Sequence, residues 1–288
     1  VQVIVTVCKV GLIFFVIVIG LGAEQGTVAN FGSTLDPAKL AAAGGFLAFF
    51  GAMRSALWGY DGWNNVAMVA SEVKEPQRNL PRALIWGSVA VMVIYLLANV
   101  AYFYVLPAGE VAASELVAAD MMRKIMGQTG ADAVSLAAMI SIFAALNGSI
   151  LTGSRVPYAM ARDGLFFSAA ARVHPGYRTP AVAILGLSAW AALLVLSGRY
   201  DQLLDYVIFA SWILYGMTTA AVLVLRRKRP DLDRPYRTFG YPIVPIVFVL
   251  IALALVISTL IDRPRESGLG LALIVAGLPF YAYWNRRR

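Results

Sequence analysis

The stretch Met53–Asn65, MRSALWGYDGWNN, decides how this chain is expected to fold. Apolar segments flank it on both sides, and within it Gly59 and Gly62 bracket Asp61. If these segments cross a membrane, the backbone here can leave helical geometry only where protein or a water-filled cavity surrounds it, because unsatisfied amides in lipid cost on the order of several kcal/mol each. Glycine permits such a departure from the helix. The pattern therefore predicts a helix that is broken at residues 59–62.

A broken helix leaves free carbonyl groups on its first half and free amide groups on its second half, which suit a cation and an anion respectively. Discontinuous helices of this kind mark substrate sites in membrane transporters. The structural alternative is a glycine-kinked helix packed on a neighbour, with Asp61 paired to Arg54. The aromatic residues Trp58, Tyr60 and Trp63 beside the aspartate favour a binding site.

The composition supports a membrane environment. Hydrophobic residues make up 60% of the 288 residues and charged residues only 14%, and the mean hydropathy is +0.72. A chain of this kind cannot cover its surface with polar groups in water. Soluble enzymes, nucleic-acid binders and disordered scaffolds are therefore poor hypotheses. The net charge of +8 lies in short loops, which indicates contact with the lipid bilayer rather than with nucleic acid.

The apolar runs predict an all-α integral membrane protein with eight spans. A bilayer core about 30 Å thick needs roughly 20 apolar residues in a helix. Eight spans use nearly the whole chain as a single transmembrane domain and leave no room for a soluble one. Val1 opens directly into an apolar run without a basic leader, so we expect the chain to begin in mid-protein. The predicted spans are 1–21, 44–73 (broken), 83–107, 133–156, 179–198, 204–225, 240–261 and 267–285.

Lys9 is the second unusual residue, because it interrupts an otherwise apolar span. A lysine there costs about 2.5–3.5 kcal/mol on insertion scales, so it is expected to face the bundle interior or water. It is either a snorkelling structural lysine or a buried ammonium that can replace a bound cation. Ser149, in the run Asn147-Gly-Ser149, is by spacing alone a small polar residue at a helix–helix contact.

Lysine and arginine in the short loops predict the orientation. If the first span runs outward, the inner loops hold most of these residues and the C-terminus is cytoplasmic. The inner loops then hold Lys74, Arg78, Arg82, Arg155, Arg162, Arg172, Arg178, Arg226, Arg227, Lys228, Arg229, Arg234, Arg237, Arg286, Arg287 and Arg288. The outer loops hold Lys39, Arg123, Lys124, Arg199, Arg263 and Arg265.

Other chemistries find little support in the residues present. The single cysteine, Cys8, lies in an apolar run and the single histidine, His174, lies in a polar stretch, so we expect no internal disulfide, no zinc site and no Cys–His pair. We therefore expect no metal, no cofactor and no enzymatic activity. A membrane-embedded transferase would need a histidine or paired carboxylates near one interface. An ion channel would need rings of like charge along a pore, whereas Lys9, Arg54 and Asp61 are isolated and of mixed sign.

Several motifs resemble the L-type branch of the amino acid–polyamine–organocation superfamily, in order and spacing along all eight predicted spans. The motifs are Trp58-Gly-Tyr-Asp-Gly-Trp-Asn64, Glu72-Val-Lys-Glu-Pro-Gln-Arg-Asn-Leu-Pro81, Leu97-Ala-Asn-Val-Ala-Tyr-Phe103, Leu146-Asn-Gly-Ser149 with Ser154-Arg155, and the run Arg226–Pro230 with Arg234-Pro235. The resemblance implies the twelve-helix fold with two inverted five-helix repeats, of which this chain would hold helices five to twelve. The first four would be missing.

The resemblance also implies a function and a site. It indicates a sodium-independent amino acid exchanger or proton-coupled permease of a bacterial-type plasma membrane, and leaves open any ancillary subunit. Trp58 matches the aromatic gate over bound substrate, and the carbonyls of Trp58, Gly59 and Asp61 would receive the substrate ammonium. Tyr60, Gly62 and Asn64 complete the expected substrate site. Lys9 matches a lysine whose amine takes the place of a sodium ion, and Ser149 matches its neighbour.

Overall fold

The computed structural model describes residues 2–32, 45–197, 200–234 and 236–286, and all regular secondary structure within these ranges is helical. The all-α prediction is confirmed. Helices suit long apolar segments because a helix satisfies its own backbone hydrogen bonds in lipid. Among the described residues, six helices are long and apolar enough to cross a membrane, and the apolar helix Ala181–Leu196 is shorter. The count of eight spans stays a prediction. Val1, Lys39, Gly44, Gly198, Arg199, Arg287 and Arg288 lie outside the described residues.

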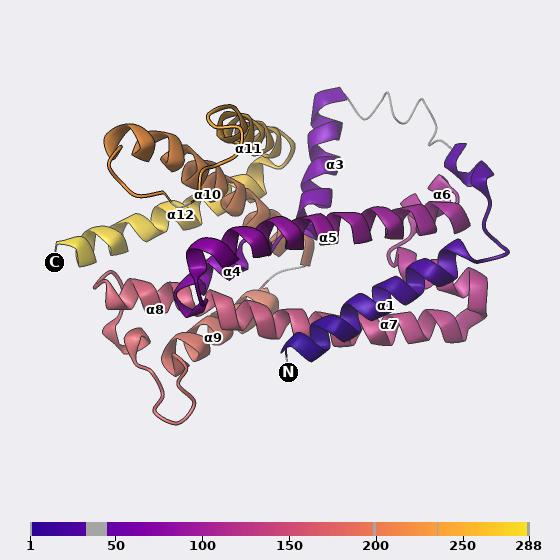
Figure 1. Ribbon diagram of the computed structural model, residues 1–288, viewed down its shortest axis with the longest axis horizontal. Helices are drawn as coiled ribbons and strands as arrows, with labels where there is room; N and C mark the ends of the chain where they lie inside the picture. The colour runs from indigo at the N-terminus through magenta and orange to yellow at the C-terminus, as the bar shows by residue number, and fades with distance from the viewer. Residues whose placement is uncertain (1, 33–44, 198–199, 235, 287–288) are drawn as a thin grey trace. The chain divides into compact units, whose positions relative to one another are not determined.

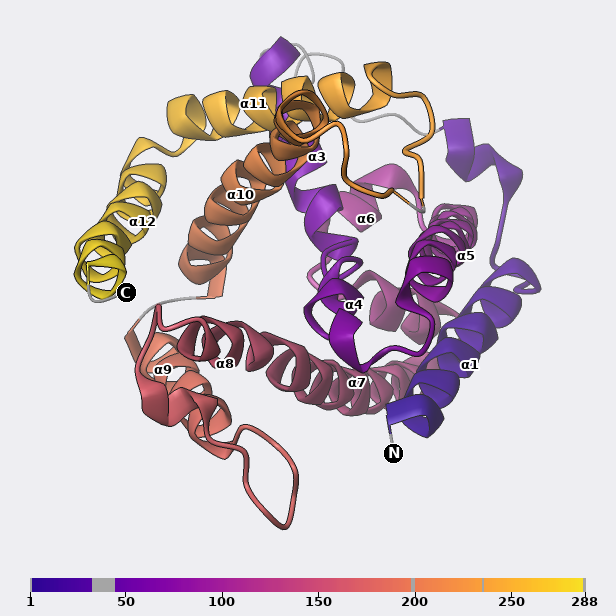
Figure 2. The same cartoon turned by 60° about the vertical axis from the view of Figure 1, so that its left-hand side comes forward.

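The chain divides into two compact units, and the first comprises residues 1–43 and 82–149. It contains α1 (Gln2–Leu21), η1 (Val28–Gly32), most of α5 (Pro76–Val105), α6 (Ala108–Ala113) and most of α7 (Val117–Gly153). In Figures 1 and 2, α1 runs beside α7 and α5. The buried residues Val16, Ala101, Val105, Leu106, Met121 and Met122 form its core.

Helix α7 begins earlier than the predicted span 133–156. It starts at Val117 and carries a sharp bend at Gly127, whose φ of 72° and ψ of −163° lie outside helical geometry. Only glycine adopts this conformation readily. The sequence places Arg123 and Lys124 in a loop, whereas the structure places both on the helical segment before the bend.

The second unit comprises residues 44–81 and 150–288. It contains α3 (Gly45–Gly59), α4 (Asn65–Met68), η2 (Ala70–Glu72), α8 (Arg155–Arg162), η3 (Ser168–Ala171), α9 (Ala181–Ser197), α10 (Tyr200–Lys228), α11 (Ile243–Asp262) and α12 (Pro264–Asn285). Helix α10 packs against α11 and α12, and α11 also contacts α3. A smaller cluster joins α8, η3 and α9 through Ala161, Ala170 and Ala183.

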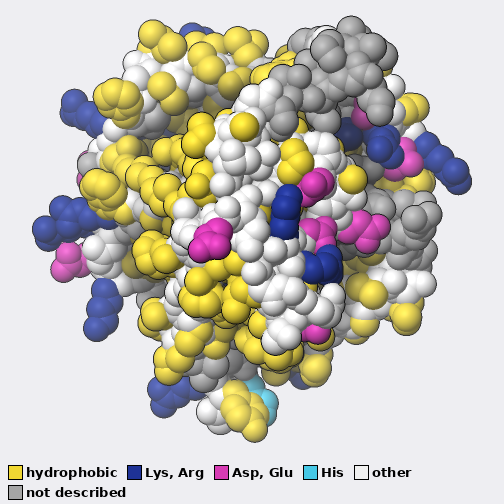
Figure 3. Space-filling model, turned by 90° about the vertical axis from the view of Figure 1, so that its right-hand side faces the viewer, with side chains coloured by type: hydrophobic (Ala, Val, Ile, Leu, Met, Phe, Trp, Pro, Cys, Tyr) yellow, Lys and Arg dark blue, Asp and Glu magenta, His cyan; other side chains and the backbone are white. Residues whose placement is uncertain are grey.

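Large hydrophobic side chains are exposed along the long helices. Phe143 on α7 is 73% exposed and Leu196 on α9 is 85% exposed. Hydrophobic side chains cover much of the face drawn in Figure 3. In water such exposed apolar surface would be unfavourable, whereas a lipid bilayer solvates it.

Candidate functional site

The chain leaves α-helical geometry between the end of α3 at Gly59 and the start of α4 at Asn65. Hydrogen bonds between residues three apart replace the helical pattern here. The amide of Asp61 donates to the carbonyl of Trp58 (3.0 Å), and the amide of Asn65 donates to the carbonyl of Gly62 (3.1 Å). Gly62 has a φ of 98°, a backbone angle that residues other than glycine rarely adopt. The two glycines thus end one helix and allow the turn that precedes the next.

Asp61 lies in this turn and its side chain is bound by α10. The hydroxyl of Tyr215 donates a hydrogen bond of 2.9 Å to Oδ1 of Asp61. The structural alternative from the sequence, an Asp61–Arg54 pair, is not formed, because Arg54 instead makes an ion pair of 3.2 Å with Asp262 at the end of α11. The aspartate is therefore held by α10 and not by Arg54.

An aromatic cavity of about 160 Å³ lies between the turn and α10. Trp212 and Tyr215 form one of its walls, with ring centroids 5.9 Å apart, and the Trp63 ring lies 6.3 Å from that of Tyr215. Three of the predicted site residues, Trp58, Tyr60 and Asp61, line the cavity, whereas Gly59, Gly62 and Asn64 do not. The other lining residues are Leu57, Ile208, Ser211 and Phe248.

Asn64 contributes a buried oxygen atom, Oδ1, that has no hydrogen-bond partner among the described residues. Buried polar atoms nearly always have a partner, so an exception calls for an explanation such as a ligand. A carbonyl-type oxygen next to the break is suited to accept a hydrogen bond from an ammonium group.

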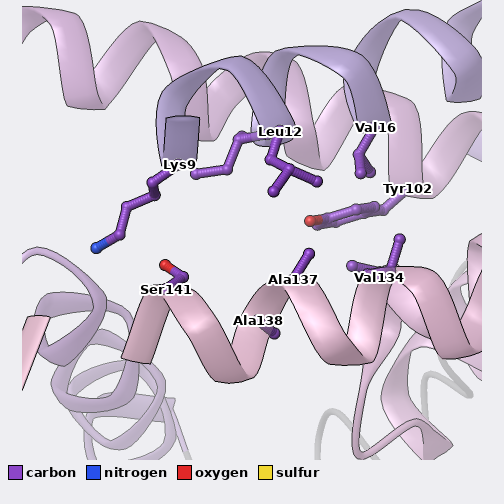
Figure 4. A pocket seen from close by; sticks show the side chains of 10 residues that line it. Lys9, Leu12, Val16, Tyr102, Val134, Ala137, Ala138 and Ser141 are labelled. Atoms are coloured by element: carbon purple, nitrogen blue, oxygen red, sulfur yellow. The ribbon is translucent and has the colours of Figure 1, made fainter. Parts of the chain in front are cut away.

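Lys9 lines a separate cavity of about 170 Å³ within the first unit, between α1, α5 and α7. Figure 4 shows Lys9 and Ser141 toward one end of this cavity and the ring of Tyr102 toward the other. Val16 and Val134 are among the apolar residues around the ring. The lining is thus mostly apolar, with Lys9, Tyr102 and Ser141 as its polar residues.

Ser149, the predicted neighbour of Lys9, does not line this cavity. It lies on α7 about two turns beyond Ser141, which occupies the cavity instead. Composition and spacing do not distinguish Ser141 from Ser149, because both are small polar residues in the same apolar span; only the resemblance of the run Leu146-Asn-Gly-Ser149 favoured Ser149.

Two further contacts hold the broken helix within the second unit. Arg54 on α3, whose side chain is 10% exposed, pairs with Asp262. Beyond the break, Nε of Arg155 lies 3.0 Å from Oε1 of Glu72 and Nη2 lies 3.4 Å from Oε2. The motifs quoted above contain Glu72 and Arg155 without pairing them. Tyr215 carries no signal in the sequence beyond a hydroxyl in an apolar span.

Comparisons with known proteins agree with this architecture. The model of the family described as amino acid permease matches residues 1–279. The b(0,+)-type amino acid transporter 1 of Homo sapiens is 33% identical over 284 residues, which cover 98% of this chain and 57% of that protein. The serine/threonine exchanger SteT of Bacillus subtilis (strain 168) is 34% identical over 243 residues, which cover 83% of this chain and 56% of that protein.

A third relative extends the similarity to another group of transporters. The large neutral amino acids transporter small subunit 2 of Homo sapiens is 34% identical over 231 residues, covering 79% of this chain and 43% of that protein. The chain thus spans about half the length of the curated relatives it matches. These relatives are transporters and not enzymes. The resemblance drawn from the motifs is confirmed: the chain belongs to the amino acid permease family of integral membrane proteins.

Proposed function

We propose that the full-length protein carries amino acids across the membrane by alternating access around the break between α3 and α4. The observation that carries this proposal is the unpartnered, buried Oδ1 of Asn64 beside a turn whose backbone has left the helix. The substrate ammonium binds to the carbonyls of Trp58, Gly59 and Asp61 and to this oxygen. Trp58 closes over the bound substrate. Tyr60 and Gly62 shape the turn.

The aromatic cavity receives the substrate side chain. It lies directly beside the turn, and its walls are aromatic rings with Asp61 and the hydroxyl groups of Ser211 and Tyr215 as polar groups. Cavities of this type, mostly apolar with a few placed polar groups, bind small ligands.

We further propose that the carrier works without sodium and that Lys9 supplies the positive charge which a sodium ion would otherwise provide. The position of Lys9 at a mostly apolar cavity, which Tyr102 and Ser141 also line, supports this role. Ser149, which does not line the cavity, acts in this proposal as a polar neighbour on α7. Transport is either obligatory exchange or net uptake with a proton, and Lys9 is a fixed charge in the first case and a proton carrier in the second.

The test uses the full-length protein in liposomes without sodium. Labelled neutral amino acid is added outside, with or without unlabelled amino acid inside. Entry only into preloaded vesicles shows exchange, and entry into empty vesicles driven by an inward proton gradient shows proton coupling. Absence of saturable entry under both conditions would contradict the proposal.

Variants of Lys9 separate its two roles. In an exchanger, Lys9→Arg retains much of the transport and Lys9→Met abolishes it, because only the fixed charge is required. In a proton-coupled carrier, Lys9→Arg loses gradient-driven uptake as well, since arginine does not release its proton. Ser149→Ala and Ser141→Ala, compared in the same assay, show which serine matters. If Lys9→Met retains sodium-independent transport, the charge assignment is wrong.

A further inference from the structure

The end of α10 and described residues of the loop that follows it line a polar cavity that the proposed transport cycle does not use. Its volume is about 450 Å³. Three arginines and one aspartate supply its charges, so its walls carry net positive charge. The lining residues are Arg226, Pro230, Leu232, Asp233, Arg234 and Arg237.

Arg234 shapes the loop. Its Nη1 donates hydrogen bonds to the carbonyls of Pro230 (3.0 Å) and Leu232 (2.8 Å), and its Nη2 donates to those of Leu225 and Arg229. These bonds wrap the chain around the guanidinium at the end of α10. Arg234 therefore maintains the cavity and contributes charge, while most of its donors are already used.

Arg226 and Arg237 remain available for a ligand. The guanidinium carbon of Arg226 lies 3.8 Å from the centroid of the Tyr241 ring, which holds the guanidinium plane in place. Arg237 is exposed. Among the residues that the structure describes, neither arginine makes an ion pair with Asp231 or Asp233. Guanidinium groups match the geometry of phosphate oxygens.

Membrane topology and the helix dipole explain part of this charge. Cations in the last turn of α10 are favourable at a helix C-terminus and are expected on the cytoplasmic side. Neither effect requires Arg237, which follows well after α10 ends, to face the same cavity as Arg226. A shared anionic ligand accounts for this convergence.

We propose that this cavity binds a phosphate group, and that the group belongs to an anionic lipid. Two large apolar side chains that follow Arg237 closely in the sequence, Phe239 and Ile243, are 86% and 69% exposed. Phe239 lies in the loop before α11 and Ile243 is the first residue of α11, so acyl chains can cover both while the headgroup reaches Arg226 and Arg237. Basic pockets at helix ends facing the cytoplasm are known to suit anionic headgroups. Free inorganic phosphate has the same charged group but gains nothing from the apolar residues.

The experiment measures lipid binding by the full-length protein in neutral detergent. Phosphatidylglycerol or phosphatidylcholine is titrated and bound lipid is counted by native mass spectrometry. The wild type is expected to prefer phosphatidylglycerol. Arg226→Gln and Arg237→Gln should each weaken this binding by about fivefold, the contribution of one juxtamembrane cation. Lys228→Gln is the matched control, because Lys228 lies on the same helix end but does not line the cavity. This variant should lose much less affinity for phosphatidylglycerol.

A second arm distinguishes the source of the phosphate. Thermal unfolding is followed with phosphatidylglycerol or with sodium phosphate. Stabilisation by phosphatidylglycerol that the Arg237→Gln variant loses supports a lipid headgroup. Equal stabilisation by sodium phosphate, also lost in the variant, supports a phosphate site with a soluble ligand. Binding that is unchanged in both arginine variants, or equal for the two lipids, would overturn the proposal. The exposed Arg237 provides a variant that is expected to fold.

Discussion

The hydroxyl of Tyr215 lies 2.9 Å from Oδ1 of Asp61 and connects α10 to the turn between α3 and α4. A carboxylate among apolar side chains is costly unless polar groups contact it. The tyrosine supplies one of these groups, and its ring also packs against Trp63 and Trp212. The position of the turn therefore depends on a helix that is more than one hundred residues away in sequence.

Tyr215→Phe should weaken substrate binding. The ring and its packing remain, but the hydrogen bond to Asp61 is lost, and such a bond contributes about 1 kcal/mol. We expect an apparent Km about fivefold higher in liposome uptake by the full-length protein. Tyr281→Phe, on exposed α12, serves as the control and should leave Km unchanged. An unaltered Km in Tyr215→Phe would show that the bond does not position the site.

Gly62→Ala should destabilise the protein, because the φ of 98° at this position is unfavourable for alanine. The expected cost is about 1–2 kcal/mol. Gly51→Ala is a matched control, since Gly51 lies inside α3 with open space around it. There the substitution should stabilise the helix by about 0.5–1 kcal/mol. Denaturant unfolding in detergent measures both, and equal effects would exclude backbone strain at Gly62.

The Arg54–Asp262 pair should show energetic coupling between α3 and α11. The Arg54 side chain is 10% exposed and that of Asp262 is 43% exposed, so the pair is partly shielded from water. A double-mutant cycle with Arg54→Met and Asp262→Ala should give a coupling free energy of about 1 kcal/mol. Asp231→Ala, at an exposed loop residue, paired with Arg54→Met, should give none. Additive effects in the first cycle would mean that the contact contributes no stability.

The Glu72–Arg155 pair should contribute more to the stability of the protein than the nearby Glu75–Arg78 pair. Arg155 is 14% exposed and contacts both carboxylate oxygens of Glu72, whereas Glu75 and Arg78 are exposed and 4.0 Å apart. We expect Glu72→Ala to lower the free energy of unfolding by about 1 kcal/mol. Glu75→Ala should change it by less than about 0.5 kcal/mol. Thermal unfolding of the two variants side by side provides the measurement, and a larger loss for Glu75→Ala would contradict this ranking.

The sequence predicted the helices, because helix formation depends mainly on residues that are close together in the chain. Apolar runs form helices because the backbone must satisfy its own hydrogen bonds in lipid, and the described helices follow these runs. The span 133–156 is a prediction about the membrane, and α7 starts before it at Val117 because a helical segment that carries Arg123 and Lys124 precedes the bend at Gly127. In the structure, Arg123 pairs with Asp120 and Lys124 with Glu110, so the charges are accommodated on a helix.

The sequence by itself determined the helical class and the position of the turn at Gly59 and Gly62, because composition and glycine content act over short distances, and the resemblance of its motifs indicated the family. Only the tertiary structure decided that Asp61 binds Tyr215, that Arg54 binds Asp262 and that Ser141 rather than Ser149 shares the cavity of Lys9. Many polar partners were compatible with each of these residues. Packing of distant helices selects among them, since each contact requires side chains from separate segments to meet within hydrogen-bonding or van der Waals distance.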